Sequence, residues 1–264
     1  MAAWTLVLIG WAFAVVMMTA LWAVQRARND AGVVDVGWAA GLGIIAIIYA
    51  VLASGAWPHR LLVAAVAGIW SARLATYIFF NRVRGKPEDG RYQTLRAKWG
   101  ERAQRNFFVF FQAQGLLDAI LSLPFLAIAL DTRPGLSGWE YAGLALWLVA
   151  ISGEAVADAQ LARWWADPAH RGRTCRRGLW RYSRHPNYFF EWLHWWVYVV
   201  MGVSAGWWWF ATLAGPALMS LFLFRITGIP ATEQQALASR GDEYRDYQRT
   251  TSMFVPWFPK RMSP

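Results

Sequence analysis

The chain is organised around one stretch, Gly178-Leu-Trp-Arg-Tyr-Ser-Arg-His-Pro-Asn-Tyr-Phe-Phe-Glu191. Basic side chains precede Pro186, and a run of apolar residues follows it. Because proline suits the first turn of a helix, where its missing N–H costs nothing, we expect a helix to begin there. Asn187 and Glu191 are four residues apart, so they share one face of that helix. A carboxylate one turn inside an apolar helix is expensive, which marks this face as a candidate site.

The basic cluster consists of Arg181, Arg184 and His185, at the point where the predicted helix meets water. Positive side chains beside the exposed N–H groups of a helix N-terminus favour an anion. The same pattern is also typical of a topology signal, in which basic residues stay in the cytoplasm beside a buried polar pair. The residues alone leave both interpretations open.

The composition indicates a polytopic membrane protein. The 264 residues are 57% hydrophobic, include 19 Trp and have a mean hydropathy of +0.25. Values this high exclude an ordinary soluble domain. The single cysteine, Cys175, excludes an internal disulfide framework and a cysteine-based metal site, and we expect no bound metal.

Seven segments approach the roughly 20 apolar residues that a spanning helix needs. We expect helices over 4–24, 33–53, 61–80, 107–130, 141–162, 186–203 and 207–224. The predicted fold class is therefore all-α, a bundle of seven transmembrane helices. A polar surface helix is expected around 91–104, and an amphipathic tail over 229–264 that ends in an extended aromatic anchor, Phe254-Val-Pro-Trp-Phe-Pro259. We see no repeat or linker, and expect one domain over 1–264.

The charges are distributed asymmetrically along this topology. The loops that seven crossings place on one side, together with the tail, hold 23 of the 26 Lys and Arg residues, whereas the opposite side holds Arg60 and Arg133. Cytoplasmic loops carry such an excess. The asymmetry predicts a cytoplasmic C-terminus, and it accounts for the net charge of +10 without nucleic acid.

Polar residues recur inside or beside the apolar segments. They are Asp35, Arg73, Gln112, Gln114, Asp118, Glu154, Asp158, Glu191 and Arg225. A central charge costs about 2.5–3.5 kcal/mol on insertion scales, so a purely structural bundle has little reason to keep so many. We expect most of them to line one cavity open to the cytoplasm. The alternative for any single residue is a hydrogen bond between helices.

The stretch from Gly178 to Trp192 resembles the C-terminal signature of the membrane steroid 5-alpha-reductase superfamily, and in particular its bacterial DUF1295 branch. Further similar motifs are Val34-Asp-Val-Gly-Trp38, Glu88-Asp-Gly-Arg-Tyr92, Ala157-Asp-Ala-Gln160 and Gly241-Asp-Glu-Tyr-Arg-Asp-Tyr247. The C-terminal pattern is also similar to that of sterol reductases and isoprenylcysteine carboxyl methyltransferases. The resemblance covers most of the chain, and implies a multi-pass protein of a bacterial inner membrane.

The resemblance implies that the region from about 154 to 264 binds NADPH from the cytoplasmic side. A lipid-like, steroid-like enone would enter from the bilayer, into a cavity formed partly by residues 30–130. Asn187 and Glu191 match positions at the nicotinamide, and Asp158 matches a further cofactor contact. The residues matched to the phosphates are Arg173, Arg181, Arg184 and His185, and those matched to the adenine end are Arg240, Tyr244 and Tyr247. No Gly-x-Gly-x-x-Gly fingerprint is present, so a soluble dinucleotide fold is not expected.

In the steroid reductases an acid and a tyrosine hold the substrate ketone, and Asp35 and Tyr77 are the candidates for these catalytic roles here. The chain has Val34-Asp35 where the family has Gln-Glu, which bears on the substrate more than on the hydride chemistry. A donor pair would stabilise charge developing on the carbonyl oxygen. His194 is a spare candidate for proton supply.

Two other functions remain open from the sequence. A methyltransferase dependent on S-adenosylmethionine shares the Arg-His-Pro-x-Tyr motif, but such enzymes tend to carry a glutamate pair where this chain has Glu233-Gln234. A transporter or lipid-binding protein would also suit a polar cavity, but we find no paired broken helices. Identifying the nucleotide that co-purifies with the protein would distinguish a reductase, a methyltransferase and a transporter or lipid-binding protein.

Overall fold

The computed structural model describes residues 1–226 and 228–260, and every named element within them is a helix. This confirms the all-α prediction. Among the described residues, six helices are long and apolar enough to cross a membrane: Ala3–Arg28, Val33–Leu52, Trp57–Val83, Gly90–Ala129, Gly138–Ala166 and Gly206–Arg240. The seven-helix count is not confirmed, because the helix that begins at Pro186 has only 16 residues. The final residues of the predicted tail, 261–264, lie outside the described part of the chain.

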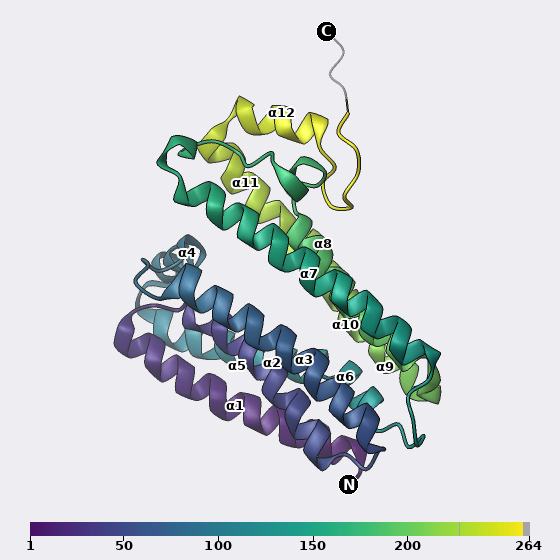
Figure 1. Cartoon of the computed structure of the whole chain (residues 1–264). Coiled ribbons are helices and arrows are strands. Elements are labelled where there is room, and N and C mark those ends of the chain that lie inside the picture. Colours follow the sequence, from purple (N-terminus) through teal and green to yellow (C-terminus); the bar gives the residue numbers. More distant parts are fainter. Residues whose placement is uncertain (227, 261–264) are drawn as a thin grey trace. The chain divides into compact units, whose positions relative to one another are not determined.

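The chain divides into two compact units (Figure 1). Unit 1 comprises Met1–Trp139 and Gly202–Ala214, and unit 2 comprises Glu140–Met201 and Gly215–Pro264. The residues expected to bind the cofactor all belong to unit 2, whereas Asp35 and Tyr77 belong to unit 1. That the two units form one domain stays a prediction.

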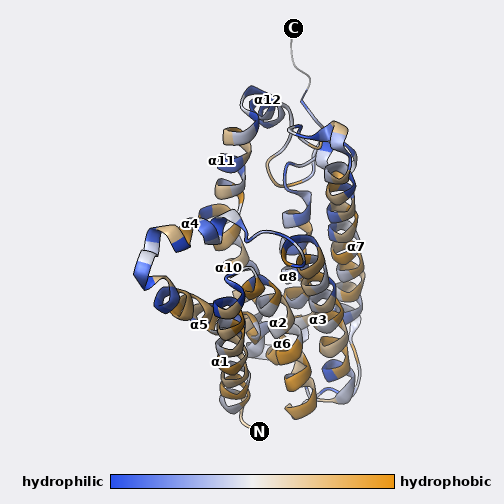
Figure 2. Ribbon diagram, turned by 90° about the vertical axis from the view of Figure 1, so that its left-hand side faces the viewer, coloured by the Kyte–Doolittle hydropathy of each residue, from blue (hydrophilic) through white to orange (hydrophobic). Residues whose placement is uncertain are grey.

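Unit 1 is built on four long helices and several short ones. They are α1 (Ala3–Arg28), α2 (Val33–Leu52), α3 (Trp57–Ile78), α4 (Gly90–Trp99), α5 (Ala103–Leu121), α6 (Leu123–Ala129) and α9 (Trp209–Thr212). Helix α2 packs against α3, and α1 packs against α5. Figure 2 shows the contrast between the apolar spanning helices and the hydrophilic α4, which confirms the predicted surface helix.

Local sequence signals explain where these helices begin and end. Helix α1 ends at Asn29, whose left-handed backbone (φ 52°) closes the last turn. Asp89 caps α4 by accepting a hydrogen bond from the Arg91 backbone N–H at 2.9 Å. The segment predicted as one helix over 107–130 is divided between α5 and α6 at Ser122, because Pro124 lies in the first turn of α6 and has no N–H to continue α5.

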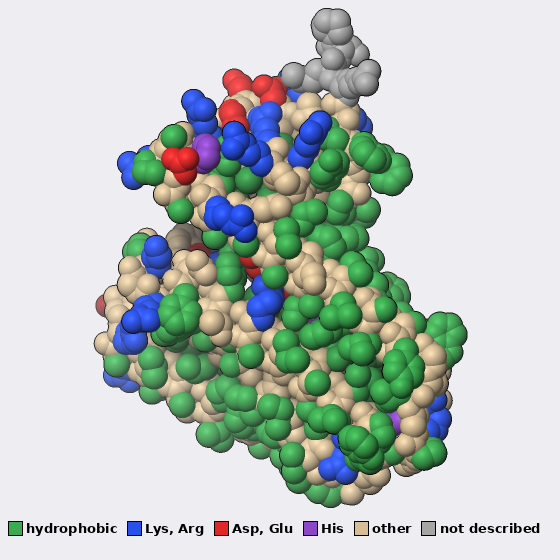
Figure 3. Space-filling view, viewed as in Figure 1, with side chains coloured by type: hydrophobic (Ala, Val, Ile, Leu, Met, Phe, Trp, Pro, Cys, Tyr) green, Lys and Arg blue, Asp and Glu red, His purple; other side chains and the backbone are tan. Residues whose placement is uncertain are grey.

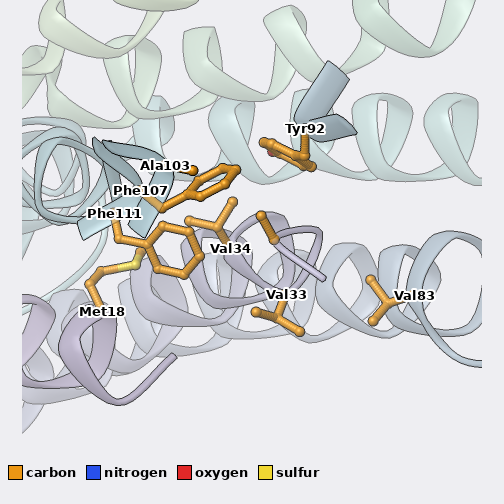
Figure 4. Packing of buried hydrophobic residues seen from close by; sticks show 9 residues of the cluster. Met18, Val33, Val34, Val83, Tyr92, Ala103, Phe107 and Phe111 are labelled. Carbon is orange, nitrogen blue, oxygen red and sulfur yellow. The ribbon is translucent and has the colours of Figure 1, made fainter. Parts of the chain in front are cut away.

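Small residues allow close helix packing in unit 1. A Cβ atom at Gly43 of α2 would lie 2.2 Å from the Ser71 hydroxyl of α3, and that hydroxyl donates to the Ala39 carbonyl at 2.6 Å. Small residues at helix contacts are typical of membrane bundles. Figure 4 shows the core at the α4 end of the unit, where Phe107 and Phe111 of α5 pack with Val34 and Met18.

Unit 2 contains most of α7 (Gly138–Ala166), all of α8 (Pro186–Met201), most of α10 (Ala214–Leu221), α11 (Ile229–Arg240) and α12 (Asp242–Thr250). Helices α7 and α8 run side by side in Figure 1. A Cβ at Gly153 of α7 would clash with the Phe190 ring of α8 at 2.4 Å, so this contact requires glycine. Helices α11 and α12 confirm the helical content predicted for the tail up to Arg249.

The segment predicted as one helix over 207–224 is interrupted. It consists of a 3-10 turn, α9, α10 and a π-helical turn over Phe222–Ile226. Pro216 cannot donate the backbone hydrogen bond that would continue α9 beyond Thr212, so the chain turns before α10 starts at Ala214.

Candidate functional site

Buried carboxylates of unit 2 gather on α7 and α8. Glu154 and Asp158 lie one turn apart on α7, and Glu191 lies in the second turn of α8. All three side chains are buried. A buried ionisable group inside an apolar helix is a functional-site candidate by default.

Asn187 joins the two helices at this point. Its side-chain Nδ2 donates to Asp158 Oδ1 at 3.2 Å, and its Oδ1 accepts from the Tyr188 backbone N–H at 3.0 Å. Two residues predicted to contact the cofactor, 29 positions apart in sequence, therefore touch in the fold. The pair presents an amide and a carboxylate, which suit a carboxamide such as that of nicotinamide.

Further along α8, Glu191 accepts a hydrogen bond from the Trp195 indole N–H at 3.1 Å. One turn later the Tyr198 hydroxyl lies 3.0 Å from His194 Nε2. The predicted face of α8 therefore carries a series of hydrogen-bonded polar groups through an apolar helix. His194 is completely buried, and this hydrogen bond gives it a structural role alongside the proposed supply of a proton.

Arg184 lies at the centre of a buried cluster that we call the hub, formed by Arg184, His185, Glu233, Tyr244 and Gln248. The Arg184 Nε donates to Glu233 Oε1 at 2.6 Å. Its Nη1 donates to the backbone carbonyls of Gln248 at 3.0 Å and Thr251 at 2.8 Å. Arg184 therefore ties the start of α8 to both tail helices.

Glu233 is the acceptor that the other hub residues share. His185 Nε2 lies 3.2 Å from Glu233 Oε1, the Gln248 amide donates to Oε2 at 2.8 Å, and the Tyr244 hydroxyl donates to Oε1 at 3.4 Å. Such charge-assisted hydrogen bonds are stronger than neutral ones. The carboxylate thus occupies the position that an external anion would take beside Arg184 and His185.

The other arginines predicted to hold phosphates are more accessible. Arg173 and Arg181 are exposed. Arg240, which the resemblance matches to the adenine end, is half-buried with its guanidinium 5.2 Å from the Tyr244 ring centroid. Figure 3 shows Lys and Arg side chains gathered around α12 and the neighbouring loops of unit 2. Exposed guanidinium groups remain available for a bidentate contact with phosphate, whereas Arg184 is already engaged within the protein.

Two predicted adenine-end tyrosines are buried in the tail. The Tyr247 hydroxyl donates to the Trp180 carbonyl, and also lies 3.2 Å from the Ser183 carbonyl. Burial, and then the neighbouring Tyr244, raise the pKa of the Tyr247 phenol well above its ordinary value. Burial and the Glu233 carboxylate raise the pKa of Tyr244 in the same way. Both phenols are therefore proton donors that hold the tail in place.

In unit 1, Asp35 is an acceptor. It receives hydrogen bonds from Tyr92 Oη at 2.6 Å and from Arg91 Nη2 at 2.9 Å. Because both contacts are made by donors, Tyr92 Oη–H and Arg91 Nη2–H, this geometry favours an accepting role for Asp35 over the donor role expected from the sequence. Tyr77, the second catalytic candidate, lies half-buried near the end of α3.

Sequence reasoning missed the partners in both units. Glu233 entered only as a departure from the methyltransferase pattern, and Arg91 and Tyr92 entered only within the motif Glu88–Tyr92. Asp35 and Tyr92 lie in the stretches Val34–Trp38 and Glu88–Tyr92, which both resemble family motifs, but no local pattern links one stretch to the other. Asp118 of α5 is completely buried beside Gly41, and its carboxyl oxygens have no hydrogen-bond partner within the described residues.

The fold and these buried polar groups define a multi-pass, all-α membrane protein. The chain matches the family model DUF1295, described as a protein of unknown function, over residues 21–251. It therefore belongs to the DUF1295 family. No match was found among curated proteins or among solved structures.

Proposed function

We propose that this protein is an integral membrane reductase that uses NADPH to reduce a conjugated carbon–carbon double bond in a steroid-like or lipid-like enone. The observation that carries the proposal is the contact between Asn187 and Asp158, because two residues that the resemblance matches to the cofactor, 29 positions apart, come together in one unit. The proposal rests also on the resemblance of the α8 stretch to steroid reductases.

The residues of unit 2 fit the parts of the cofactor. Asn187, Asp158 and Glu191 would bind the carboxamide of the nicotinamide, with the carboxylates as acceptors and the amide as donor. Arg173 and Arg181 would bind phosphate groups, for which the guanidinium fork is well shaped, and Arg240 would lie at the adenine end. Arg184 and His185 would support this region by holding Glu233. NADPH supplies a hydride when bound, and that chemistry belongs to the cofactor.

The substrate side of the proposal depends on unit 1. A group that donates a hydrogen bond to the substrate carbonyl would stabilise the charge that develops on its oxygen. Tyr77 can donate such a bond, and Asp35 would act by positioning Tyr92 and Arg91, which it binds directly. Apolar spanning helices around these residues suit a lipid-like substrate.

One observation favours the alternative that the protein is a methyltransferase dependent on S-adenosylmethionine. Glu233 contacts Arg184 and His185 of the Arg-His-Pro-x-Tyr motif, so a tail glutamate does meet this motif in the fold. S-adenosylmethionine is therefore the competing ligand in the experiment below, and a protein that binds neither nucleotide would be assigned to lipid binding or transport.

The test compares thermal stabilisation of the detergent-purified protein by NADPH, NADH and S-adenosylmethionine. Glu191→Gln keeps an oxygen that can accept from Trp195 but removes the charge. Loss of a charge-assisted contact of about 1.5–3 kcal/mol should weaken NADPH binding roughly ten- to a hundred-fold. Glu140→Gln, the same change at a buried glutamate in the first turn of α7, is the matched control. Parent-like affinity in Glu191→Gln, or tighter binding of S-adenosylmethionine, contradicts the proposal.

A further inference from the structure

The C-terminal segment 252–260 is fixed to the rest of unit 2 by its backbone. The Ser252 carbonyl accepts from Arg184 N at 2.8 Å, Trp257 N donates to the Tyr182 carbonyl at 2.9 Å, and Ser183 Oγ donates to the Phe254 carbonyl at 2.7 Å. These bonds include a parallel bridge between Ser183 and Ser252. The segment therefore has a defined course along residues 182–184.

Along this course the side chains divide into inward and outward sets. Phe254 is buried, with its ring centroid 5.6 Å from that of Phe189 and 4.8 Å from that of Phe224. The outward set, which we call the tail patch, consists of Met253, Val255, Trp257 and Phe258. Trp257 is 69% exposed and Phe258 is 76% exposed, although the backbone hydrogen bonds hold the segment in place.

The tail patch lies beside the first turns of an apolar helix. Phe254, within the same segment, packs on Phe189 and Trp192, which follow Pro186 at the start of α8. The backbone bond from Trp257 to Tyr182 places the patch next to the polar residues that precede α8. This boundary between polar and apolar sequence is where tryptophan and other aromatic residues concentrate in membrane proteins.

Basic side chains flank the patch. Lys260 is exposed two positions after Phe258, and its backbone N–H donates to the Thr250 carbonyl at 2.8 Å. Arg249, which precedes Thr250 in the sequence, is exposed at the end of α12. Figure 3 shows hydrophobic and basic side chains on the surface of this part of unit 2. Lysine and arginine near a membrane surface are attracted to anionic headgroups.

We propose that the tail patch with Arg249 and Lys260 is a docking surface for the headgroup region of a bilayer that contains anionic phospholipid. Trp257 and Phe258 enter the boundary between headgroups and acyl chains, and the two cations contact lipid phosphates. A second copy of the chain fits less well, because a two-fold symmetric contact on this patch would bring identical cations together. The inference stands independently of the proposed reductase activity.

The experiment uses the full chain in lipid nanodiscs and exploits its single cysteine. In a Cys175→Ala background, Trp257→Cys or Phe258→Cys is labelled with an environment-sensitive fluorophore. Asp242→Cys is the control, because Asp242 is 89% exposed at the opposite end of α12. Labels at 257 and 258 should lose most of their emission to a lipid-attached quencher and little to aqueous iodide, and the label at 242 should show the reverse.

Two further arms identify the headgroup and the occupant. Nanodiscs of phosphatidylcholine mixed with phosphatidylglycerol should increase lipid quenching over phosphatidylcholine alone, and Arg249→Gln with Lys260→Gln should remove that increase. Quenching at 257 and 258 by iodide alone would overturn the proposal. So would efficient disulfide formation between the unlabelled Trp257→Cys copies when one nanodisc holds two chains, because the occupant would then be a second copy.

Discussion

The two units use the same ion-pair chemistry under different exposure to solvent. In unit 2, the side chains of Arg184 and Glu233 are only 9% and 14% exposed. In unit 1, those of Arg91 and Asp35 are 44% and 26% exposed. In unit 1 the pair joins the polar helix α4, which contains Arg91, to the start of the apolar helix α2, which contains Asp35. In unit 2 the pair joins the tail helix α11, which contains Glu233, to the start of the apolar helix α8, which Arg184 precedes. Because the cost of breaking an ion pair rises with burial, we expect the two pairs to differ in their effect on stability although their distances, 2.6 Å and 2.9 Å, are similar.

The arrangement of acceptors differs as well. In unit 2 one carboxylate, Glu233, receives contacts from all the other hub residues. Unit 1 distributes the same task over three carboxylates. Asp35 binds Arg91 and Tyr92, and Asp89 binds Arg91 at 3.0 Å. Glu88 binds Arg96 at 2.7 Å and the Ala31 backbone N–H at 2.8 Å. A single substitution should therefore disturb unit 2 more than unit 1.

The largest effect is expected for Arg184→Met. The change leaves Glu233 buried without its guanidinium partner and leaves two backbone carbonyls unbonded, so it should cost about 3–5 kcal/mol. Thermal unfolding in detergent and protease cleavage after Arg240 would measure the loss. Adding Glu233→Met should recover part of it, because the uncompensated charge is then removed. If Arg184→Met unfolds like the parent protein, the buried hub is not the stronger of the two clusters.

A smaller effect is expected for Tyr247→Phe, which removes a buried hydroxyl and leaves the Trp180 and Ser183 carbonyls short of a donor, at a cost of about 1–3 kcal/mol. Because the folded protein holds the Tyr244 and Tyr247 protons more tightly than the unfolded chain does, their contribution is intact below about pH 10 and is lost as the pH rises further.

The measurement is the unfolding temperature of the parent and of Tyr247→Phe as the pH is raised. The variant should start lower and lose less stability in alkali, because one of the two raised phenols is gone. Tyr141→Phe, at an exposed position at the start of α7, is the matched control and should be close to neutral. An equal alkaline loss in the variant and the parent would contradict the assignment to Tyr247.

The smallest effect on stability is expected for Asp35→Asn. Its ion pair with Arg91 is partly solvated and should contribute about 0.2–1 kcal/mol. Within the proposed function, the same change should lower enone reduction while NADPH affinity stays intact. Asp246→Asn, at an exposed pair with Arg249, controls for loss of a surface charge. A stability loss as large as that of Arg184→Met would remove the contrast between the units.

Much of the fold could be predicted because membrane spans depend on length and hydropathy, which are local properties. The predicted helices at 4–24 and 33–53 correspond closely to α1 and α2. The breaks at Ser122 and Leu213 were missed because an apolar run hides them. The signals were Pro124 and Pro216, whose missing N–H groups interrupt the helical ladder even where hydropathy continues.

Residues of the candidate site could be proposed from the sequence where they share one face of a helix, but not where they depend on contacts between distant segments. Asn187 and Glu191 were identified by their spacing on one face, and the family resemblance added Asp158, which does contact Asn187. The pairs Arg184–Glu233 and Asp35–Tyr92 join residues 49 and 57 positions apart. Neither pattern nor spacing constrains such contacts, since they depend on how whole helices pack.

The length of α8 has a consequence for the surrounding lipid. Sixteen residues at a rise of about 1.5 Å each extend roughly 24 Å, whereas the hydrocarbon core of a bilayer is about 30 Å thick. The 3-10 turn Gly202–Ser204 continues directly from α8, and an apolar helix that still falls short of the hydrocarbon core is accommodated by local thinning of the bilayer. Acyl-chain length thus becomes a variable to which this helix is sensitive, and thin membranes suit it best.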